Sequence, residues 1–137
     1  MINIEEFMNI FRDCETSRDK VVIKSNIADA VSFVKEKYGF DMLKEIFATD
    51  KKDMGIELNY RLYSTEDEEE VILSAYTKDE MPSVSGIFDS ATADEKEIYD
   101  LFGVKFIGNN ELKRLYMPED FEGHPLRKDY VLNNDED

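Results

Sequence analysis

The chain has 137 residues, of which 42% are hydrophobic and 12% aromatic, and its apolar side chains are spread along its length. This length suits one folding unit with its own core and is short for two, and the composition is that of a globular protein. The formal net charge of −15 excludes nucleic acid and bare anionic lipid as natural partners. Such partners repel a surface that has no excess of Lys and Arg.

Two chemically versatile side chains occur once each, because Cys14 is the only cysteine and His124 the only histidine. One chain therefore cannot build an intramolecular disulfide, a zinc site from Cys and His, or an iron-sulfur cluster site. We expect Cys14 to be buried as a small apolar residue and His124, in its Gly-His-Pro sequence, to be structural. Nucleotide-binding, hydrolase and zinc-protease motifs are also missing. No catalytic, cofactor-binding or metal-binding residue is predicted, and no cofactor.

The start of the chain, MINIEEFMNIFRD, carries acidic residues where a signal peptide would carry positive charge. No apolar run approaches the roughly 20 residues that span a bilayer. We therefore expect a cytoplasmic protein that reaches a membrane only through a partner.

A short helix and a short strand are predicted at the beginning of the chain. Asn3 and Glu6 form a capping pair for the helix, in which Cys14 is also placed. The β-branched run at 21–23 predicts a strand within residues 18–24. The apolar positions of the helix recur at helical spacing and are Ile4, Phe7, Met8 and Phe11.

A second helix is the clearest element of the pattern. Either Ser25 or Asn26 can cap its start, and Gly39 stands where a left-handed C-terminal cap is expected. Its apolar stripe consists of Ile27, Ala30, Val31, Val34 and Tyr38.

The middle of the chain predicts antiparallel strands. Residues 43–49 form a strand, 50–53 a polar turn, and 56–63 a strand of strict alternation, which is typical of a half-buried antiparallel strand. The acidic run 66–70 and the apolar run 71–76 complete a hairpin whose loop is charged. A calcium loop is a weaker interpretation of that run, which lacks alternating oxygen ligands and a central Gly. In the alternating strand, Ile56, Leu58, Tyr60 and Leu62 are expected in the core, and Glu57, Asn59, Arg61 and Tyr63 toward solvent.

A third helix follows the crossing segment 78–90. Thr92 and Glu95 form a capping box for it, and Gly103 ends it. Residues 104–107 predict one more strand. The apolar face of this helix consists of Ile98, Leu101 and Phe102.

These elements predict an α+β fold in two layers, with helices on one face of a mainly antiparallel or mixed sheet and an extended C-terminal arm. We expect one domain over residues 1–130 and an acidic, flexible tail over residues 131–137.

Two runs in the last third carry a resemblance to a known family. Residues 95–103 read EKEIYDLFG, with Pro-Ser-Val at 82–84 before them, and residues 122–130 read EGHPLRKDY. Both runs, in this order, resemble signatures of the thirty-kilodalton subunit family of respiratory NADH dehydrogenases, which includes the corresponding subunits of energy-converting nickel-iron hydrogenases. The resemblance is firm over residues 82–130 and looser over 38–76. Lys96 replaces the usual arginine, and Asn109-Asn110 stands where the family usually has His-Pro.

The resemblance implies a peripheral subunit that binds no cofactor. Its closing segment is expected to lie against the large catalytic subunit, of the forty-nine-kilodalton or nickel-iron hydrogenase type, beside a neighbouring iron-sulfur subunit. Gly and Pro give this segment a fixed extended backbone, and its charges make directional contacts. The chain is short compared with respiratory members, which favours a hydrogenase as the parent complex. The residues expected to bind the partner are Phe102, His124, Pro125, Leu126, Arg127, Lys128, Asp129 and Tyr130.

Three alternatives stay open. Arg127 and Asp129 can instead pin the chain to its own domain. A free-standing acidic interaction or regulatory module would bind a basic site in a salt-sensitive way and have no oxidoreductase neighbours. An enzyme with a carboxylate site would show perturbed carboxylates in a pocket and turnover by the isolated chain.

Overall fold

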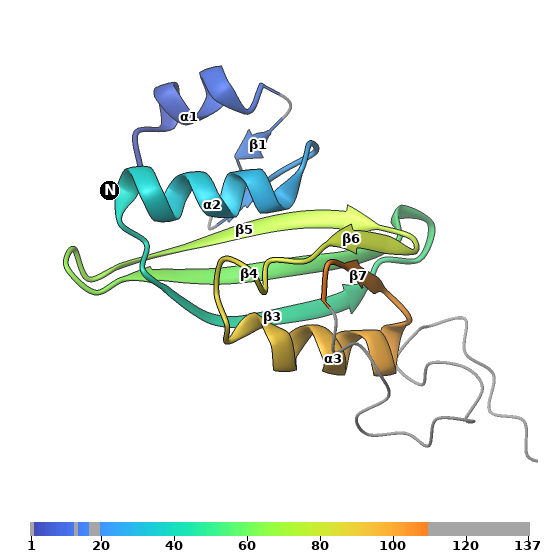
Figure 1. Ribbon diagram of the computed structural model, residues 1–137. Helices are drawn as coiled ribbons and strands as arrows, with labels where there is room; N and C mark the ends of the chain where they lie inside the picture. Colours follow the sequence, from blue (N-terminus) through green and yellow to red (C-terminus); the bar gives the residue numbers. More distant parts are fainter. Residues whose placement is uncertain (1, 13, 17–19, 110–137) are drawn as a thin grey trace, which may run out of the picture.

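A layer of helices packs on one face of a mixed β-sheet in the computed structural model (Figure 1), which describes residues 2–12, 14–16 and 20–109. The α+β class and the helix layer predicted from the sequence are confirmed. The predicted C-terminal arm and acidic tail lie outside the described residues. In chain order the elements are α1 (Ile4–Ile10), β1 (Glu15–Thr16), β2 (Lys20–Val22), α2 (Ile27–Tyr38), β3 (Met42–Asp50), the 3-10 turn η1 (Lys52–Met54), β4 (Ile56–Ser64), β5 (Glu69–Thr77), β6 (Glu80–Pro82), α3 (Ala91–Phe102) and β7 (Lys105–Ile107).

The main sheet has five strands in the order β1-β2-β5-β4-β3. Only β2 and β5 run parallel in it, and the other neighbours are antiparallel. The β4–β5 hairpin forms its centre, pairing from Ser64 with Glu69 at the tip to Ile56 with Thr77 at the far end. This pairing confirms the predicted hairpin. Its alternating apolar residues and charged loop leave one register that buries the apolar face.

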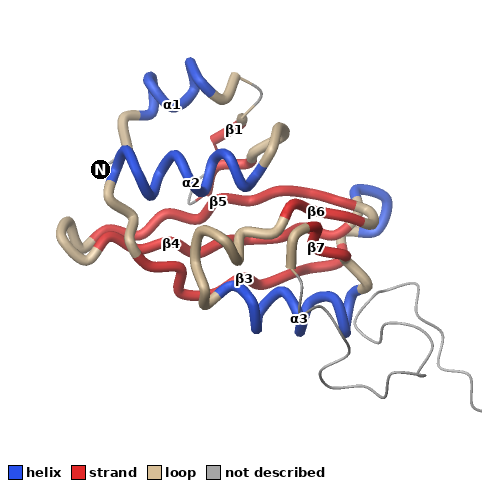
Figure 2. The backbone as a smooth tube through the Cα atoms, viewed as in Figure 1, coloured by secondary structure: helices blue, strands red, loops and turns tan. Residues whose placement is uncertain are grey.

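Two short strands, β6 and β7, form a second, parallel pair in front of the main sheet (Figure 2). They lie between α2 and α3, since β6 contacts α2 and β7 contacts α3. The strand at 104–107 was predicted, whereas β6 was not. Its three residues carry no periodic pattern and end in Pro82, so their pairing is decided by β7, far along the chain.

Local hydrogen bonds fix both ends of α2 and the start of α1. The Asn26 side chain accepts from the backbone N–H groups of Ala28 (2.8 Å) and Asp29 (3.2 Å), and Gly39 adopts the left-handed conformation with φ 75°. Asn3 caps α1 by accepting from the Glu6 N–H at 3.1 Å. These predicted caps are confirmed, and Asn26 is the cap of α2.

The placement of Cys14 in the first helix was wrong, because α1 ends at Ile10. The thiol is nevertheless buried, as predicted, with 6% exposed. The helix itself is held by an aromatic cluster in which the Phe7 and Phe11 rings lie 4.8 Å apart and Phe33 packs against both. Burial of such a ring contributes about 1.5–3 kcal/mol, more than the intrinsic helicity of so short a segment provides.

The capping box predicted for α3 was also wrong. The helix begins after Ser90, which makes no side-chain cap bond, and Glu95 points into the core. Residues at the start of α3 bond to the free edge of β3 instead. Asp94 accepts from the Ile46 N–H at 3.0 Å, and Ser90 donates to the Leu43 carbonyl at 3.2 Å. An uncovered edge strand would invite pairing with another chain, and α3 blocks it here.

No helix in the described ranges combines the length and the apolarity that a membrane crossing requires.

Candidate partner-docking site

A buried carboxylate joins the two described parts of the sequence that carry the family resemblance. Glu95, in the first half of α3, has no exposed surface. It accepts hydrogen bonds from the Ser83 hydroxyl (2.7 Å), the Val84 N–H (2.8 Å) and the Asn109 side-chain amide (2.9 Å). We call these four residues the Glu95 cluster. It fastens the two residues after β6, the first half of α3 and the second residue after β7 to one point.

The charge state of Glu95 is set by burial. Loss of solvent raises the pKa of its carboxyl above the ordinary value, and the nearby charge of Asp94 raises it further, while the three donated hydrogen bonds lower it only in part. Burial raises the pKa of the Tyr60 hydroxyl, and the nearby carboxylate of Glu95 raises it further. This hydroxyl has no hydrogen-bond partner among the described residues. The Glu95 cluster is therefore a group of polar atoms that lies inside the core, away from water.

Other members of the run EKEIYDLFG are buried as well. Asp100 has no exposed surface, and Phe102 is 8% exposed within the hydrophobic core. In the described structure this run thus organises the interior of the domain. Phe102 presents only a small part of its ring, and the contact with a partner predicted for it stays a prediction.

The remaining predicted site residues lie outside the described part of the chain. They are His124, Pro125, Leu126, Arg127, Lys128, Asp129 and Tyr130.

The Glu95 cluster also holds the segment that follows β7. Asn109 is the last described residue and is 8% exposed, and its amide is bound to Glu95. Its backbone N–H also donates to the Phe106 carbonyl at 3.2 Å. Both the side chain and the backbone of Asn109 are therefore held by the domain. Sequence reasoning treated Asn109 only as a departure from the family; the Pro-Ser-Val motif preceding the helix was the available signal for Ser83.

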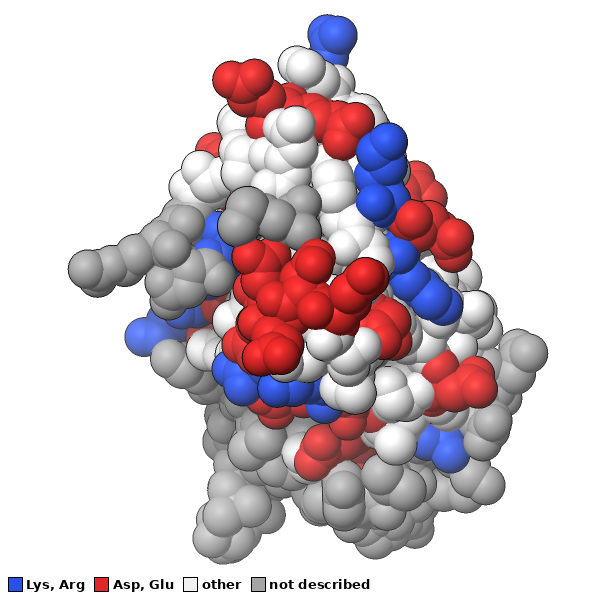
Figure 3. Space-filling view, turned by 90° about the vertical axis from the view of Figure 1, so that its left-hand side faces the viewer, with Lys and Arg blue, Asp and Glu red and all other residues white. Residues whose placement is uncertain are grey.

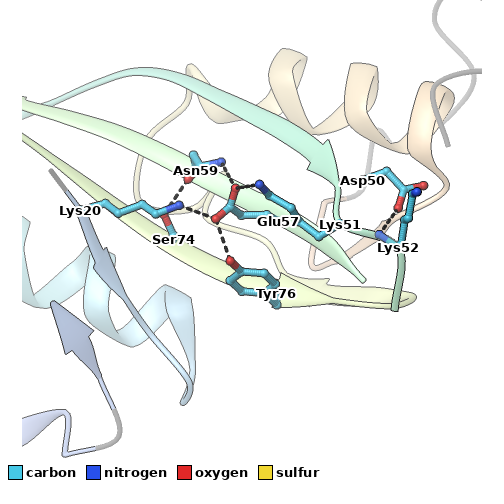
Figure 4. Close-up of polar contacts among 8 residues, drawn as sticks. All are labelled: Lys20, Asp50, Lys51, Lys52, Glu57, Asn59, Ser74 and Tyr76. Carbon is cyan, nitrogen blue, oxygen red and sulfur yellow. Dashed lines mark hydrogen bonds and ion pairs between the residues drawn. The ribbon is translucent and has the colours of Figure 1, made fainter. Parts of the chain in front are cut away.

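A second buried carboxylate, Glu57, lies on the face of the sheet that α2 and α3 leave free (Figure 4). It accepts from the Lys20 ammonium, from the Tyr76 hydroxyl at 2.9 Å and from the Asn59 amide at 3.4 Å. The Lys51 ammonium lies 3.9 Å from its other oxygen. Strands β2, β4 and β5 are joined through this one group.

The expected exposure of Glu57 and Asn59 was wrong, because each is 4% exposed. Asn59 also accepts from the Ser74 hydroxyl at 2.6 Å, and the side chains of Lys20, Lys51 and Tyr76 point toward Glu57 (Figure 4). Burial raises the pKa of the Glu57 carboxyl, but its hydrogen bonds with Lys20, Tyr76 and Asn59 outweigh burial and leave the pKa below the ordinary value. Within the described residues no group of three or more His, Cys, Asp or Glu side chains is arranged to hold a metal ion.

The comparison with known proteins covers both sequence runs that carry the resemblance. The model of the family described as respiratory-chain NADH dehydrogenase, 30 Kd subunit, matches residues 21–136. The chain belongs to this family. As a member of the 30 Kd subunit family, it is an oxidoreductase subunit of the complex I type or of a related complex, and it works beside other subunits.

Individual members of the 30 Kd subunit family align with this chain over nearly its full length. The matching subunit of the NADH-quinone oxidoreductase of Moorella thermoacetica is 35% identical over 142 aligned positions, covering 96% of this chain and 95% of the relative. Its namesake in Geobacter sulfurreducens is 32% identical, and the alignment covers 93% of this chain and 85% of that relative.

A solved structure supports both the fold and the kinship. A chain in the membrane-bound sulfane sulfur reductase, an archaeal respiratory membrane complex, superposes with a TM-score of 0.75 at 25% identity, covering 94% of this chain and 84% of that chain. The family fold therefore occurs in respiratory complexes with different reactions.

Proposed function

We propose that this 30 Kd family subunit is a non-catalytic, peripheral part of a complex I-related, membrane-associated oxidoreductase. It docks on the large catalytic subunit through its closing segment and stabilises the electron-transfer module beside an iron-sulfur subunit. Its place is the cytoplasmic face of the membrane, reached only through the complex.

The Glu95 cluster is the observation that carries the proposal. A docking segment binds more tightly when its start is held, because less conformational freedom is lost on binding. Glu95 holds Asn109, and the second family motif follows Asn109 in the sequence, at residues 122–130.

Within that segment each residue type has a role in the proposal. Arg127, Lys128 and Asp129 fix the register through charge-assisted hydrogen bonds, and Pro125 and Leu126 supply apolar contact. His124 and Tyr130 flank this core of the motif and complete the contact.

Truncation tests the docking role in the native complex. A chain that ends at Glu122 keeps every described residue but loses the second motif. It should fold, with unchanged circular dichroism, and no longer co-purify with the large subunit. A chain that ends at Tyr130 loses only the acidic tail and should co-purify normally.

Normal assembly of the chain that ends at Glu122 would rule out the docking segment. Assembly lost with both truncations would assign the contact to residues 131–137 instead. The same purification identifies the parent complex, since nickel in the large subunit indicates a hydrogenase and a quinone site indicates the respiratory enzyme.

A further inference from the structure

Strand β5 runs on beyond the end of its parallel neighbour β2. Strand β2 pairs with residues 72–74 of β5, and the Ile23 N–H donates to the Ser74 carbonyl at 2.7 Å before the chain turns away to enter α2. Backbone groups alternate in direction along a strand, so the N–H and C=O of Tyr76 point the same way as those of Ser74. On that side no hydrogen bond from the described residues reaches the Tyr76 N–H. Strand β5 therefore has a short free edge at Tyr76.

A groove of about 480 Å³ opens beside this free edge, and we call it the edge groove. It falls in the size range of about 300–1,000 Å³ that is typical of binding pockets. Met54, from η1, is 62% exposed at the groove, whereas Met81, from β6, is 6% exposed. The apolar part of the lining consists of Val22, Ile23, Met54, Ala75, Tyr76 and Met81.

The walls of the edge groove are held in place by local contacts. Gly55 lies so close to the end of β5 that a β-carbon on it would be 2.5 Å from the Thr77 carbonyl oxygen. The Lys51 N–H donates to the Gly55 carbonyl at 2.8 Å and closes the turn that carries Met54. The Thr77 hydroxyl accepts from the Glu80 N–H at 3.1 Å, which fixes the start of β6. A preformed groove loses little conformational freedom when it binds a partner.

The lining of the edge groove carries no net charge, although the chain as a whole is strongly acidic. One acid and one base line it, Glu15 and Lys24, and they pair with each other at 2.7 Å. At the opposite end of the sheet, acidic side chains gather around the β4–β5 tip (Figure 3). The edge groove therefore suits an uncharged, apolar occupant.

We propose that the edge groove is a second docking surface, which takes an extended, uncharged segment of a neighbouring protein subunit. The segment pairs with β5 at Tyr76, in the place that β2 leaves, and puts an apolar side chain into the groove. A free strand edge is a template for such pairing, in which backbone hydrogen bonds give affinity and the pocket selects the side chain. The two methionines adapt their shape to the side chain that enters.

This inference is independent of the closing segment. The chain that ends at Glu122 keeps every residue of the edge groove. It should bind a groove probe like the full chain, even where it no longer co-purifies with the large subunit. The two proposals can therefore fail separately.

Nuclear magnetic resonance of the isotope-labelled full-length chain tests the strand pairing. The probe is the capped, uncharged hexapeptide Ser-Thr-Leu-Val-Thr-Ser. Its binding should be saturable, shift the Tyr76 amide signal and slow the exchange of that amide with solvent. A probe methylated on the backbone nitrogens of Leu and Val keeps both side chains but loses its central donors. It should bind about three- to tenfold more weakly.

The apolar side of the groove is tested with the same probe. Met54→Ser should weaken binding by about three- to tenfold, because part of the apolar lining is lost. The matched control is Met8→Ser, on α1 and outside the groove, where the side chain is 39% exposed. It should leave the affinity within about twofold.

Four outcomes would overturn the proposal. Equal weakening by Met54→Ser and Met8→Ser would mean unspecific adhesion to exposed apolar side chains. Undiminished binding of the methylated probe would mean that no strand pairing takes place. Tighter binding of a probe with Lys at both ends would assign the groove to a basic occupant. Absence of any response at Tyr76 in the unaltered chain would mean that this edge takes no extended segment.

Discussion

Two buried carboxylates in one small domain have pKa values shifted in opposite directions, and their partners explain the difference. Burial raises the pKa of Glu57, but its hydrogen bonds with Lys20, Tyr76 and Asn59 and the charge of Lys20 leave the pKa below the ordinary value. Glu95 has only neutral donors, so burial dominates and its pKa is raised. At an effective dielectric constant near 20, a unit charge about 4 Å away contributes roughly 4 kcal/mol, enough to reverse a moderate desolvation penalty.

Glu95→Gln is expected to lower the free energy of unfolding by about 1–3 kcal/mol, because the amide presents N–H donors where the carboxylate accepts. The loss should be largest near pH 4 and shrink as pH rises. A raised folded pKa means that the native state binds the proton more tightly, so the contribution of Glu95 to stability falls as pH passes from the ordinary to the raised value. Urea unfolding at several pH values measures both effects.

Glu97→Gln is the matched control, two residues along the same helix and half-buried. It should change the unfolding free energy by less than about 0.5 kcal/mol. If Glu95→Gln were as stable as the unaltered chain at every pH, the Glu95 cluster would not be holding Asn109 and the loop after β6.

At the scale of elements, the helices are fixed by their ends and by the strands that they cover. Helix α2 is closed by Asn26 and by left-handed Gly39, both local signals. Helix α3 has no side-chain cap bond. Ser90 and Asp94 bond to β3, and Glu95, which the local rule assigns to a capping box, enters the core instead. Tertiary contacts replaced local capping at the helix that carries the family motif.

Asn26→Ala should destabilise the protein by about 1 kcal/mol, since two N–H groups of the first turn of α2 lose their acceptor. Ser25→Ala removes the neighbouring hydroxyl, which caps nothing in the described structure, and should cost a few tenths of a kcal/mol at most. Thermal unfolding of both variants gives the comparison. Equal losses would mean that the cap is shared or that Asn26 acts through another contact.

At the scale of the whole molecule, the main electrostatic feature is the excess of acidic over basic side chains. The chain carries 32 acidic and 17 basic side chains. Ion pairs such as Arg61 with Glu45 are partly exposed and contribute little, whereas self-repulsion acts over the entire surface. The acidic surface therefore costs stability in the isolated subunit, and a basic neighbour would relieve that cost.

Added salt should raise the melting temperature of the isolated chain by a few degrees between about 10 mM and about 0.3 M sodium chloride, because screening weakens the self-repulsion. Glu66→Gln with Glu68→Gln should reduce this rise. Lys24→Gln with Lys37→Gln, which makes the chain more acidic, should enlarge it. A melting temperature that falls with salt would show that attractive ion pairs outweigh the repulsion.

The sequence by itself determined the features that depend on residues close together in the chain. Asn3, Asn26 and Gly39 mark helix ends through bonds within a few residues, and the alternation over 56–63 leaves one way to bury a strand. The two motifs identified the family for the same reason, since each is a contiguous run. The pocket lined by Ile2, Val21 and Phe40, which come from separate segments of the chain, carried no such signal.

Only the tertiary structure decided what the buried polar residues do. Glu57 meets Lys20 across 37 positions and Glu95 meets Asn109 across 14, distances over which no local pattern predicts a partner. A carboxylate can cap a helix, face solvent or enter the core, and the free energy of each choice depends on the donors that the fold supplies. Alternation gave the direction of each side chain, and the folded surroundings decided whether water reached it.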